Sequence, residues 1–283
     1  MARTACRHES DAEYILSGPP LPAMKAPTTP RDRARWRDRL VHLLLPAPCL
    51  ACGTPLPAAG NSLGLCPACH DRLRPPAAGC AICSRPLTGA LPEEWCCASC
   101  RHRPPAFDRL LALWSYEEPL DAVIQGLKFR RLDYLGHHLG TAIAIHWQEI
   151  LSEADLVVPV PLHWWRRITR GYNQSERIAR AISRRLHLPF SAALVRCRRT
   201  PPQTSLGRTE RLANLQSAFR IHPAVNLRGK RVILVDDVAT TGATLEAAAS
   251  VLRRHGATAI LATVAGKTPL RALPGPTEDQ LTL

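Results

Sequence analysis

Apolar positions in the second half of the chain alternate between runs typical of buried strands and spacings typical of helices. Strands are predicted where apolar and β-branched residues follow one another closely, at 107–116, 156–160, 231–235 and 259–264. Helices are predicted where apolar residues recur every three or four positions, at 120–129, 135–150, 174–186 and 244–255. Strands and helices that alternate in this way predict a parallel sheet covered by helices, which is an α/β fold.

The first hundred residues follow a different pattern. Residues 1–40 are rich in proline, arginine and small residues and have no sustained apolar period, so they are predicted to be a disordered basic extension. A short amphipathic helix is expected from Trp36 to Leu44. The segment from Cys49 to Cys100 has cysteine, proline and glycine at short intervals. It cannot build a conventional hydrophobic core and needs cross-links or bound metal ions to be stable. The expected domains are the extension, a cysteine-rich module at 41–104, an α/β domain at 105–270 and a flexible tail at 271–283.

The net positive charge of the chain indicates the kind of partner that it binds. The chain has 37 lysines and arginines against 23 acidic residues, a formal net charge of +14. Segment 166–211 holds 12 arginines, no lysine and only two glutamates. A solvated basic face is the simplest interpretation, but the planar fork of a guanidinium also suits phosphate oxygens. A polyanion is therefore the expected partner, either a small phosphorylated molecule or a nucleic acid strand.

The sequence favours a cytoplasmic protein. No apolar run approaches the roughly 18 residues that span a bilayer, and the N-terminus has no apolar stretch of the signal-peptide type. The 11 cysteines are therefore expected as free or metal-bound thiols, because a reducing compartment does not favour disulfides.

The most informative motif follows the strand at 231–235. Two adjacent carboxylates, Asp236 and Asp237, come at its carboxyl end, where open α/β sheets bind ligands. Small and hydroxyl residues then open a helix, and their N–H groups are expected to form an anion nest in which Gly242 lets the backbone approach closely. A sugar phosphate fits both parts, since its hydroxyls would donate to the carboxylates. The alternative is an ordinary strand-to-helix turn capped by threonines.

This motif resembles the signature of the type I phosphoribosyltransferases. The resemblance implies that Asp236 and Asp237 hold the ribose hydroxyls of phosphoribosyl diphosphate, bound with Mg²⁺. It also implies a loop for the 5-phosphate, formed by Ala239, Thr240, Thr241, Gly242, Ala243 and Thr244.

Other motifs resemble the ComF family, in which a cysteine-rich N-terminus precedes a phosphoribosyltransferase-like domain. They are Leu127-Lys128-Phe129, the strand and loop at 155–162, Arg170-Gly171-Tyr172-Asn173-Gln174, and a segment from Arg199 to Phe219 that resembles a mobile loop. The resemblance implies a set of diphosphate and mobile-loop residues, namely Lys128, Pro161, Leu162, Arg166, Arg170, Asn173, Gln174, Gln203 and Arg211.

Some of these basic residues have simpler interpretations. Lys128 also fits a surface lysine on an amphipathic helix. The arginines within 177–185 fit a solvated helix face. Residues 200–206 contain Thr-Pro-Pro-Gln, which cannot continue a helix, so a loop is predicted there.

Eight cysteines form four Cys-x-x-Cys knuckles with the spacing of zinc ribbons. Four thiolates fill a tetrahedral Zn²⁺ shell, so two structural sites are predicted, at Cys49, Cys52, Cys66 and Cys69 and at Cys80, Cys83, Cys97 and Cys100. Cys96 is adjacent to Cys97 and could replace it as the ligand. Redox-active pairs are the alternative. Chelation is expected to unfold this module and leave the α/β domain folded.

Two functions remain open at this point. The first is an enzyme that binds Mg²⁺-phosphoribosyl diphosphate and transfers its phosphoribosyl group, although no residue set in the sequence indicates the acceptor. The second, implied by the ComF resemblance, is an accessory protein that handles single-stranded DNA together with DNA-uptake proteins. Trp164 and Trp165, beside two arginines, would either stack on a base or belong to the core.

The resemblance also bears on the start of translation. In the ComF family the first knuckle lies close to the N-terminus, so residues 1–23 are expected to be an extension without a family counterpart. Met24 is expected as an alternative start, and a genuine flexible tail is the other interpretation.

Overall fold

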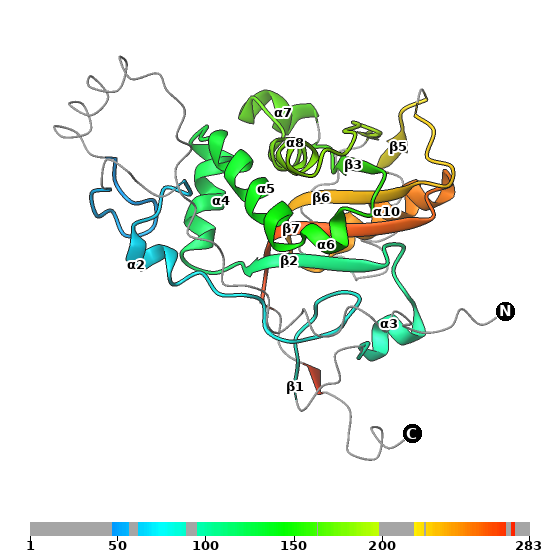
Figure 1. The fold of residues 1–283 in the computed structure, drawn as a ribbon, viewed down its shortest axis with the longest axis horizontal. Coiled ribbons are helices and arrows are strands. Elements are labelled where there is room, and N and C mark those ends of the chain that lie inside the picture. Colours follow the sequence, from blue (N-terminus) through cyan, green and yellow to red (C-terminus); the bar gives the residue numbers. More distant parts are fainter. Residues whose placement is uncertain are drawn as a thin grey trace.

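A parallel sheet of four strands forms the centre of the molecule. The computed structural model describes residues 47–56, 62–88, 95–162, 164–197, 218–223, 225–269 and 273–274. The strand order is β2-β7-β6-β3, and all three pairings are parallel (Figure 1). These strands are β2 (Arg109–Ser115), β7 (Ala259–Lys267), β6 (Arg231–Ala239) and β3 (Leu156–Pro159). The expected α/β fold is therefore confirmed.

Helices cover both faces of the sheet. On one face lie α4 (Leu120–Phe129), α5 (Tyr134–His146) and α8 (Gln174–Leu186), and on the other lies α10 (Ala243–Arg254) (Figure 1). The side chains of β6 alternate between the two layers: Ile233 and Val235 pack with α4, α5 and α8, whereas Val232 and Leu234 pack with α10. A strand buried on both faces is what an unbroken apolar run predicts.

The helices at 120–129 and 174–186 have the predicted bounds, but the predicted helix at 135–150 is divided. The backbone leaves the helical conformation at Trp147 (φ −108°, ψ 26°), so α5 ends there and a short α6 (Gln148–Leu151) follows. Trp147 and Ile150 both pack against the core cluster, and the turn between the helices allows this.

Strands β6 and β7 are longer than predicted. They stay paired beyond the apolar runs, with Val238 opposite Gly266 and Ala239 opposite Lys267. The carboxylates Asp236 and Asp237 therefore belong to the strand itself rather than to the loop after it. The connection between β3 and α8 contains the short helix α7 (Trp164–Arg170), which was not predicted.

A glycine sets the distance between α5 and α8. A Cβ atom at Gly140 would lie 2.3 Å from the carbonyl oxygen of Ile178 and 2.7 Å from the Cβ of Ala181. Any larger residue would push α8 away from α5. The close approach places the first turn of α8 beside the carboxyl ends of β3 and β6.

Several predictions fall outside the described residues. The expected disorder of 1–40, the helix near Trp36 and the start at Met24 are among them, as is the loop at 200–206. On either side of that last segment, β4 (Leu194–Arg196) and β5 (Phe219–Ile221) form a two-stranded antiparallel sheet. Among the described residues, no helix is long and apolar enough to cross a membrane.

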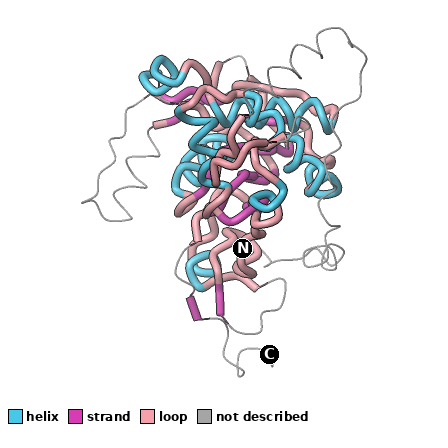
Figure 2. The backbone as a smooth tube through the Cα atoms, turned by 90° about the vertical axis from the view of Figure 1, so that its left-hand side faces the viewer, coloured by secondary structure: helices cyan, strands magenta, loops and turns pink. Residues whose placement is uncertain are grey.

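The cysteine-rich region contains little regular structure. It has the short helices α2 (Pro67–His70) and α3 (Ala98–His102) and the strand β1 (Leu87–Thr88), which pairs with β8 (Leu273–Pro274). Figure 2 shows that the end of the molecule carrying β1 and β8 is mostly loop. Residues 273–274, expected within a flexible tail, are thus paired with the cysteine-rich region.

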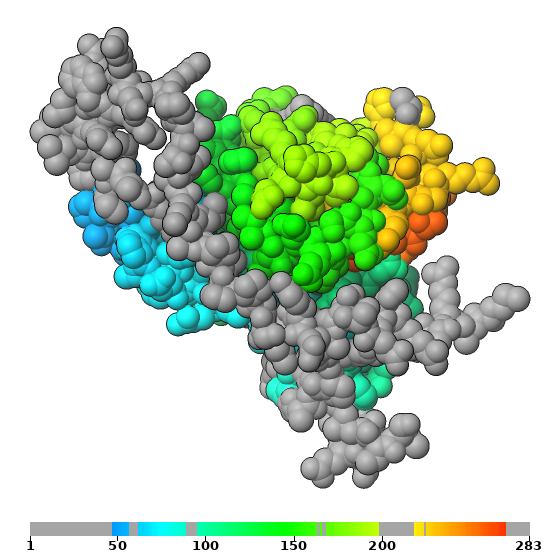
Figure 3. Space-filling view, in the orientation of Figure 1, coloured from blue at the N-terminus to red at the C-terminus, as the bar shows by residue number. Residues whose placement is uncertain are grey.

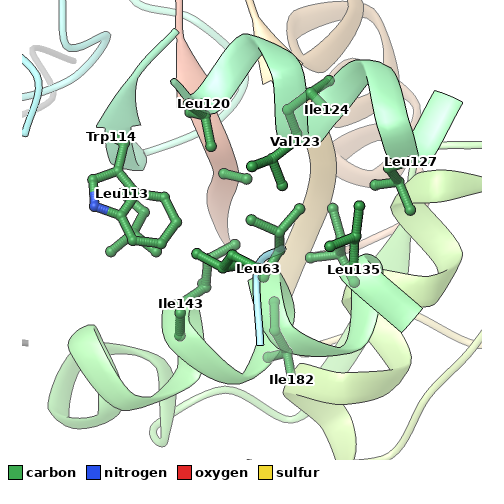
Figure 4. Packing of buried hydrophobic residues seen from close by; sticks show 14 of the residues in the cluster. Leu63, Leu113, Trp114, Leu120, Val123, Ile124, Leu127, Leu135, Ile143 and Ile182 are labelled. Atoms are coloured by element: carbon green, nitrogen blue, oxygen red, sulfur yellow. The ribbon is translucent and has the colours of Figure 1, made fainter. Parts of the chain in front are cut away.

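The first half of the cysteine-rich region packs into the core of the α/β domain. Leu63 and Leu65 are almost completely buried and belong to the same cluster as the apolar side chains of α4 and α5. Figure 4 shows Leu63 between Ile124 of α4 and Ile143 of α5, and Figure 3 shows this region, in blue and cyan, against the surface of the domain. Apolar burial therefore joins the first half of the module to the domain, and that this module unfolds separately on chelation stays a prediction.

Candidate functional site

The two carboxylates lie where β6 extends past its neighbour β3. Pairing between these strands ends at Val235, so Asp236 and Asp237 have no β3 residue beside them. The Lys128 ammonium of α4 lies 3.0 Å from Asp237 Oδ2, and the Ser175 hydroxyl of α8 donates to Asp236 Oδ1 at 2.7 Å. The Asp237 N–H donates to the same oxygen at 2.9 Å. Two helices and one strand thus bring a lysine and a serine to the carboxylate pair.

The environment makes Asp236 hard to ionise. Burial is the main cause that raises its pKa, to about 7, and the negative charge of Asp237 adds to it. The hydrogen bonds from Ser175 and from the Asp237 N–H act in the opposite direction, as does the Lys128 charge. A group that brings hydroxyl donors or a cation to this carboxyl would favour its ionised form.

The loop after β6 has the form of an anion nest. Gly242 has φ +79°, in the left-handed region, and α10 begins immediately after it. The Thr241 hydroxyl accepts a hydrogen bond from the Ala243 N–H at 3.4 Å. Within the described part of the chain, the N–H groups of Thr241 and Gly242 donate to no protein acceptor. These N–H groups and the positive end of α10 make the loop suitable for an anion.

The conformation of Gly242 gives a reason for glycine at this position. A Cβ atom at this position would meet no other protein atom within 4 Å, so the expected close approach to a bound phosphate stays a prediction. The requirement is the positive φ, which side chains disfavour.

The Arg-Gly-Tyr-Asn-Gln motif meets the Leu-Lys-Phe motif in space. The Tyr172 hydroxyl donates to the carbonyl oxygen of Leu127, and the Arg170 guanidinium lies 5.1 Å from the centre of the Phe129 ring. Lys128, between the two contacted residues, is thereby placed beside the carboxylates. The side chain of Lys128 is 20% exposed, so it is not the surface lysine of the alternative interpretation.

Asn173 and Gln174 are buried rather than displayed to solvent. Asn173 Nδ2 donates to the Val160 carbonyl at 3.0 Å, which ties the start of α8 to the end of β3. Gln174 Oε1 accepts from Arg170 at 3.3 Å. Asn173 Oδ1 and Gln174 Nε2 are buried atoms without a hydrogen-bond partner in the described structure. Both residues therefore hold the segment between β3 and α8 in place, and each has one buried polar atom without a hydrogen bond in the described structure.

The structure describes only some of the remaining residues that were predicted to bind the diphosphate. Pro161 and Leu162 follow β3 after Val160 and are half-buried. The side chain of Arg166, and both Gln203 and Arg211, lie outside the described structure. The arginines of α8 have the solvated face that was the simpler interpretation: Arg177 pairs with Asp133 and Arg180 with Glu176 at the surface.

Two residues at the site were missed from the sequence. Ser175 follows the Arg-Gly-Tyr-Asn-Gln motif directly and binds Asp236. Lys267, at the end of β7, donates to the Thr240 carbonyl at 2.6 Å. The signal for Lys267 was a lysine at the carboxyl end of an otherwise apolar strand, level with Ala239 in the neighbouring strand.

The cysteines form two tetrads. In each, all four sulfurs lie within 4.8 Å of one another. The members are Cys49, Cys52, Cys66 and Cys69 in the first tetrad, and Cys80, Cys83, Cys97 and Cys100 in the second. Cys96 is buried but lies outside the second tetrad, which decides between Cys96 and Cys97.

The two tetrads are copies of one structural unit. Each cysteine of the second tetrad follows its counterpart by 31 positions (49 and 80, 52 and 83, 66 and 97, 69 and 100). The hydrogen bonds repeat with the same offset: the Cys66 N–H donates to Cys49 Sγ, and the Cys97 N–H donates to Cys80 Sγ, both at 3.3 Å. Four converging sulfurs are the donor set of a closed tetrahedral metal site, so each tetrad can hold one structural metal ion. Hydrogen bonds between Cys52 and Thr54 lower the pKa of Cys52 to about 6, which favours the thiolate that a metal needs.

Comparison with known proteins agrees with this arrangement. The family model of the phosphoribosyl transferase domain matches residues 173–274. The DNA utilization protein YhgH of Escherichia coli K12 is 35% identical over 225 residues, covering 77% of this chain and 96% of that protein.

Two competence proteins also match. Competence protein F of Haemophilus influenzae is 31% identical over 74% of this chain and 91% of that protein. Competence protein ComFC of Bacillus subtilis is 27% identical over 68% of this chain and 79% of that protein. With a parallel sheet that ends in a carboxylate pair and an anion nest, and two cysteine tetrads before it, the chain belongs to the ComF/YhgH family of proteins with a phosphoribosyltransferase domain.

Proposed function

We propose that the protein binds Mg²⁺-phosphoribosyl diphosphate at the carboxyl end of β6. The observation that carries this proposal is the carboxylate pair directly before an anion nest whose N–H groups at Thr241 and Gly242 are free among the described residues. Ribose hydroxyls would donate to Asp236 and Asp237, and the 5-phosphate would accept from the loop 239–244. A ligand that has hydroxyls and a phosphate a few ångströms apart satisfies both halves at once.

The diphosphate would lie on the side of Lys128 and Arg170. Lys128 lies 3.0 Å from Asp237, and Arg170 is held by Gln174 and by the ring of Phe129, the residue that follows Lys128. Mg²⁺ bound to the diphosphate would supply further neutralisation of its negative charge. Cations that are in place before the ligand arrives lose little free energy to reorganisation when charge develops on a leaving diphosphate.

A transfer reaction is the chemistry that this arrangement supports. Breaking the bond between the anomeric carbon and the diphosphate oxygen leaves positive character on the sugar and negative charge on the leaving group. Lys128 and Arg170 would stabilise the leaving group, and Asp236 and Asp237 would fix the ribose while an acceptor attacks. We propose phosphoribosyl transfer on this basis, with an acceptor that these residues do not identify.

Calorimetry with Mg²⁺-phosphoribosyl diphosphate tests the binding proposal. The double variant Asp236→Asn, Asp237→Asn should bind more weakly by about 2 to 3 kcal/mol, because amides accept ribose hydroxyls less well than carboxylates. Glu149→Gln removes an exposed carboxylate of α6 and is the matched control. Equal affinities of the double variant and the wild type would disprove the assignment. Released diphosphate in the presence of candidate bases would establish transfer.

A second candidate function is an accessory role with single-stranded DNA. Trp165 on α7 is 49% exposed, so the interpretation of this tryptophan as a core residue is wrong. An exposed indole on a helix that also carries arginines can stack on an unpaired base while the cations contact phosphates. The matched relatives are named for DNA utilization and competence, which supports the same role.

Fluorescence anisotropy with labelled single-stranded DNA tests this second function. Wild-type protein should bind, and its affinity should fall steeply with salt, because binding releases counterions from the phosphates. Trp165→Ala should weaken binding by about 1 to 3 kcal/mol with an unchanged salt slope. Val195→Ala, which truncates an apolar side chain that is 42% exposed on β4, is the control. A Trp165→Ala protein that binds as tightly as the wild type would remove α7 from the interface.

We further propose that the metal in both tetrads is Zn²⁺ with a structural role. Four thiolates leave no open coordination position for a substrate or a water. Sulfur-only tetrahedral sets also favour zinc over the hard cations Mg²⁺ and Ca²⁺.

A further inference from the structure

Lys267 is a buried cation directly beneath the proposed phosphate loop. It is the last residue of β7, its side chain is almost fully enclosed (4% exposed), and its Nζ donates to the Thr240 carbonyl at 2.6 Å. No carboxylate among the described residues lies within ion-pair distance of it. Enclosing an ammonium in this way is unfavourable unless negative charge lies close by.

The sheet does not need this lysine. The backbone of β7 is already paired with β6 up to Lys267 and with β2 at Ser115, and the Thr268 N–H donates to the Ala239 carbonyl at 2.9 Å. An apolar side chain of similar length would fill the same space without the cost of burying a charge. The ammonium group therefore points to a role in the loop.

The hydrogen bond to Thr240 determines how the loop presents its donors. In a trans peptide the carbonyl and the following N–H point in opposite directions. Lys267 holds the Thr240 carbonyl on its own side, so the Thr241 N–H is turned to the opposite side. That N–H has no protein acceptor among the described residues, which is the state expected of a donor reserved for an anion.

We propose that Lys267 is a positioning residue for the 5-phosphate, which fixes the 240–241 peptide and places a positive charge behind the loop. This proposal rests on the proposed binding of phosphoribosyl diphosphate. It assigns Lys267 to one part of the ligand only, because Lys128, a cation assigned to the diphosphate, lies beside Asp237. The two groups of cations can therefore be tested separately with two smaller ligands.

Calorimetry on the full chain with ribose 5-phosphate and, separately, with Mg²⁺-diphosphate is the experiment. Lys267→Met should weaken ribose 5-phosphate binding by about tenfold or more and leave Mg²⁺-diphosphate binding unchanged. Lys267→Arg keeps the charge and a donor and should recover part of the loss. Lys128→Met should show the reverse pattern, and Lys230→Met, which changes an exposed lysine, should affect neither ligand.

The outcomes separate this proposal from the one on which it rests. If Lys267→Met binds ribose 5-phosphate as the wild type does, the role of Lys267 is disproved while the site stands. If Lys267→Met loses both ligands together with a lower melting temperature, and Lys267→Arg recovers only the melting temperature, the lysine is structural and the proposal fails. A wild-type protein that binds neither ligand overturns the proposed function and this inference with it.

Discussion

The Lys128 ammonium lies 3.0 Å from the Asp237 carboxylate, and both side chains are largely shielded from solvent. The pair joins α4 to β6 and neutralises one of the two adjacent carboxylates before any ligand binds. Asp236 then keeps the raised pKa of a buried carboxyl beside a second negative charge. The site therefore holds one carboxylate that is paired with a lysine and one carboxyl whose pKa is raised to about 7.

The first prediction concerns stability and pH. The pKa of Asp236 is about 7 in the folded protein, against the ordinary value of 3.8 that applies to the unfolded chain. Between pH 3.8 and pH 7 the folded state therefore binds more protons than the unfolded state. The free energy of unfolding should fall as the pH rises from about 4 to 7, and this contribution should level off above 7. Urea unfolding at a series of pH values measures it, and Asp236→Asn should remove the slope. An unchanged slope in Asp236→Asn would assign it to another group.

Ligand binding should show the opposite dependence on pH. Ribose hydroxyls are donors, so they favour ionised Asp236, and affinity for phosphoribosyl diphosphate should rise as the pH passes 7. Lys128→Met should shift this rise to higher pH, because the Lys128 charge lowers the pKa of Asp236. Lys230→Met is the control of equal charge change at the surface. Calorimetry from pH 6 to 8 distinguishes a shifted midpoint from a uniform loss of affinity, which would mean that Lys128 acts only on the ligand.

The metal content provides a third prediction. Purified protein should contain about two zinc ions per chain, one in each tetrad. Cys97→Ser should reduce this to about one, whereas Cys96→Ser should leave it at two, because only Cys97 lies in the tetrad. Elemental analysis of the three proteins gives the result. Disulfides in place of zinc, or loss of zinc in Cys96→Ser, would contradict the assignment.

The two tetrads should differ in their effect on the α/β domain. The first tetrad shares its hydrophobic cluster with α4 and α5, whereas Cys80, Cys97 and Cys100 of the second belong to a small cluster of their own. Cys69→Ser should therefore lower the melting temperature of the whole domain, and Cys100→Ser should lower it much less. Circular dichroism at 222 nm (helical signal) follows the domain in both proteins. Equal effects would mean that the two tetrads support the domain to the same extent.

Leu63 tests the same contact without touching a metal ligand. Leu63→Ala should destabilise the domain by about 2 to 5 kcal/mol, because it leaves a cavity among the side chains of α4 and α5. Ile168→Ala, at a position that is 66% exposed, should change stability by less than about 0.5 kcal/mol. Chemical unfolding followed by tryptophan fluorescence measures both. A small effect of Leu63→Ala would show that the first tetrad unit is separable from the core.

Local sequence determined the elements whose signals lie within a few residues. The bounds of α4 and α8, the strand before Asp236 and the spacing of the cysteine knuckles all follow from patterns of apolar residues or ligands that neighbour one another in the chain. The parallel order of the sheet follows from the alternation of these elements, since a strand that returns parallel needs a helix between.

Only the tertiary structure decided which distant residues share a site. Ser175 reaches Asp236, Lys128 reaches Asp237 and Lys267 reaches Thr240 because the sheet places the carboxyl ends of its strands together and α5 packs closely on α8. Burial likewise separated Cys97 from Cys96 and placed Leu63 in the core. Contacts between residues far apart in sequence depend on the register of strands and the packing of helices, and a local pattern of polar and apolar positions does not contain that information.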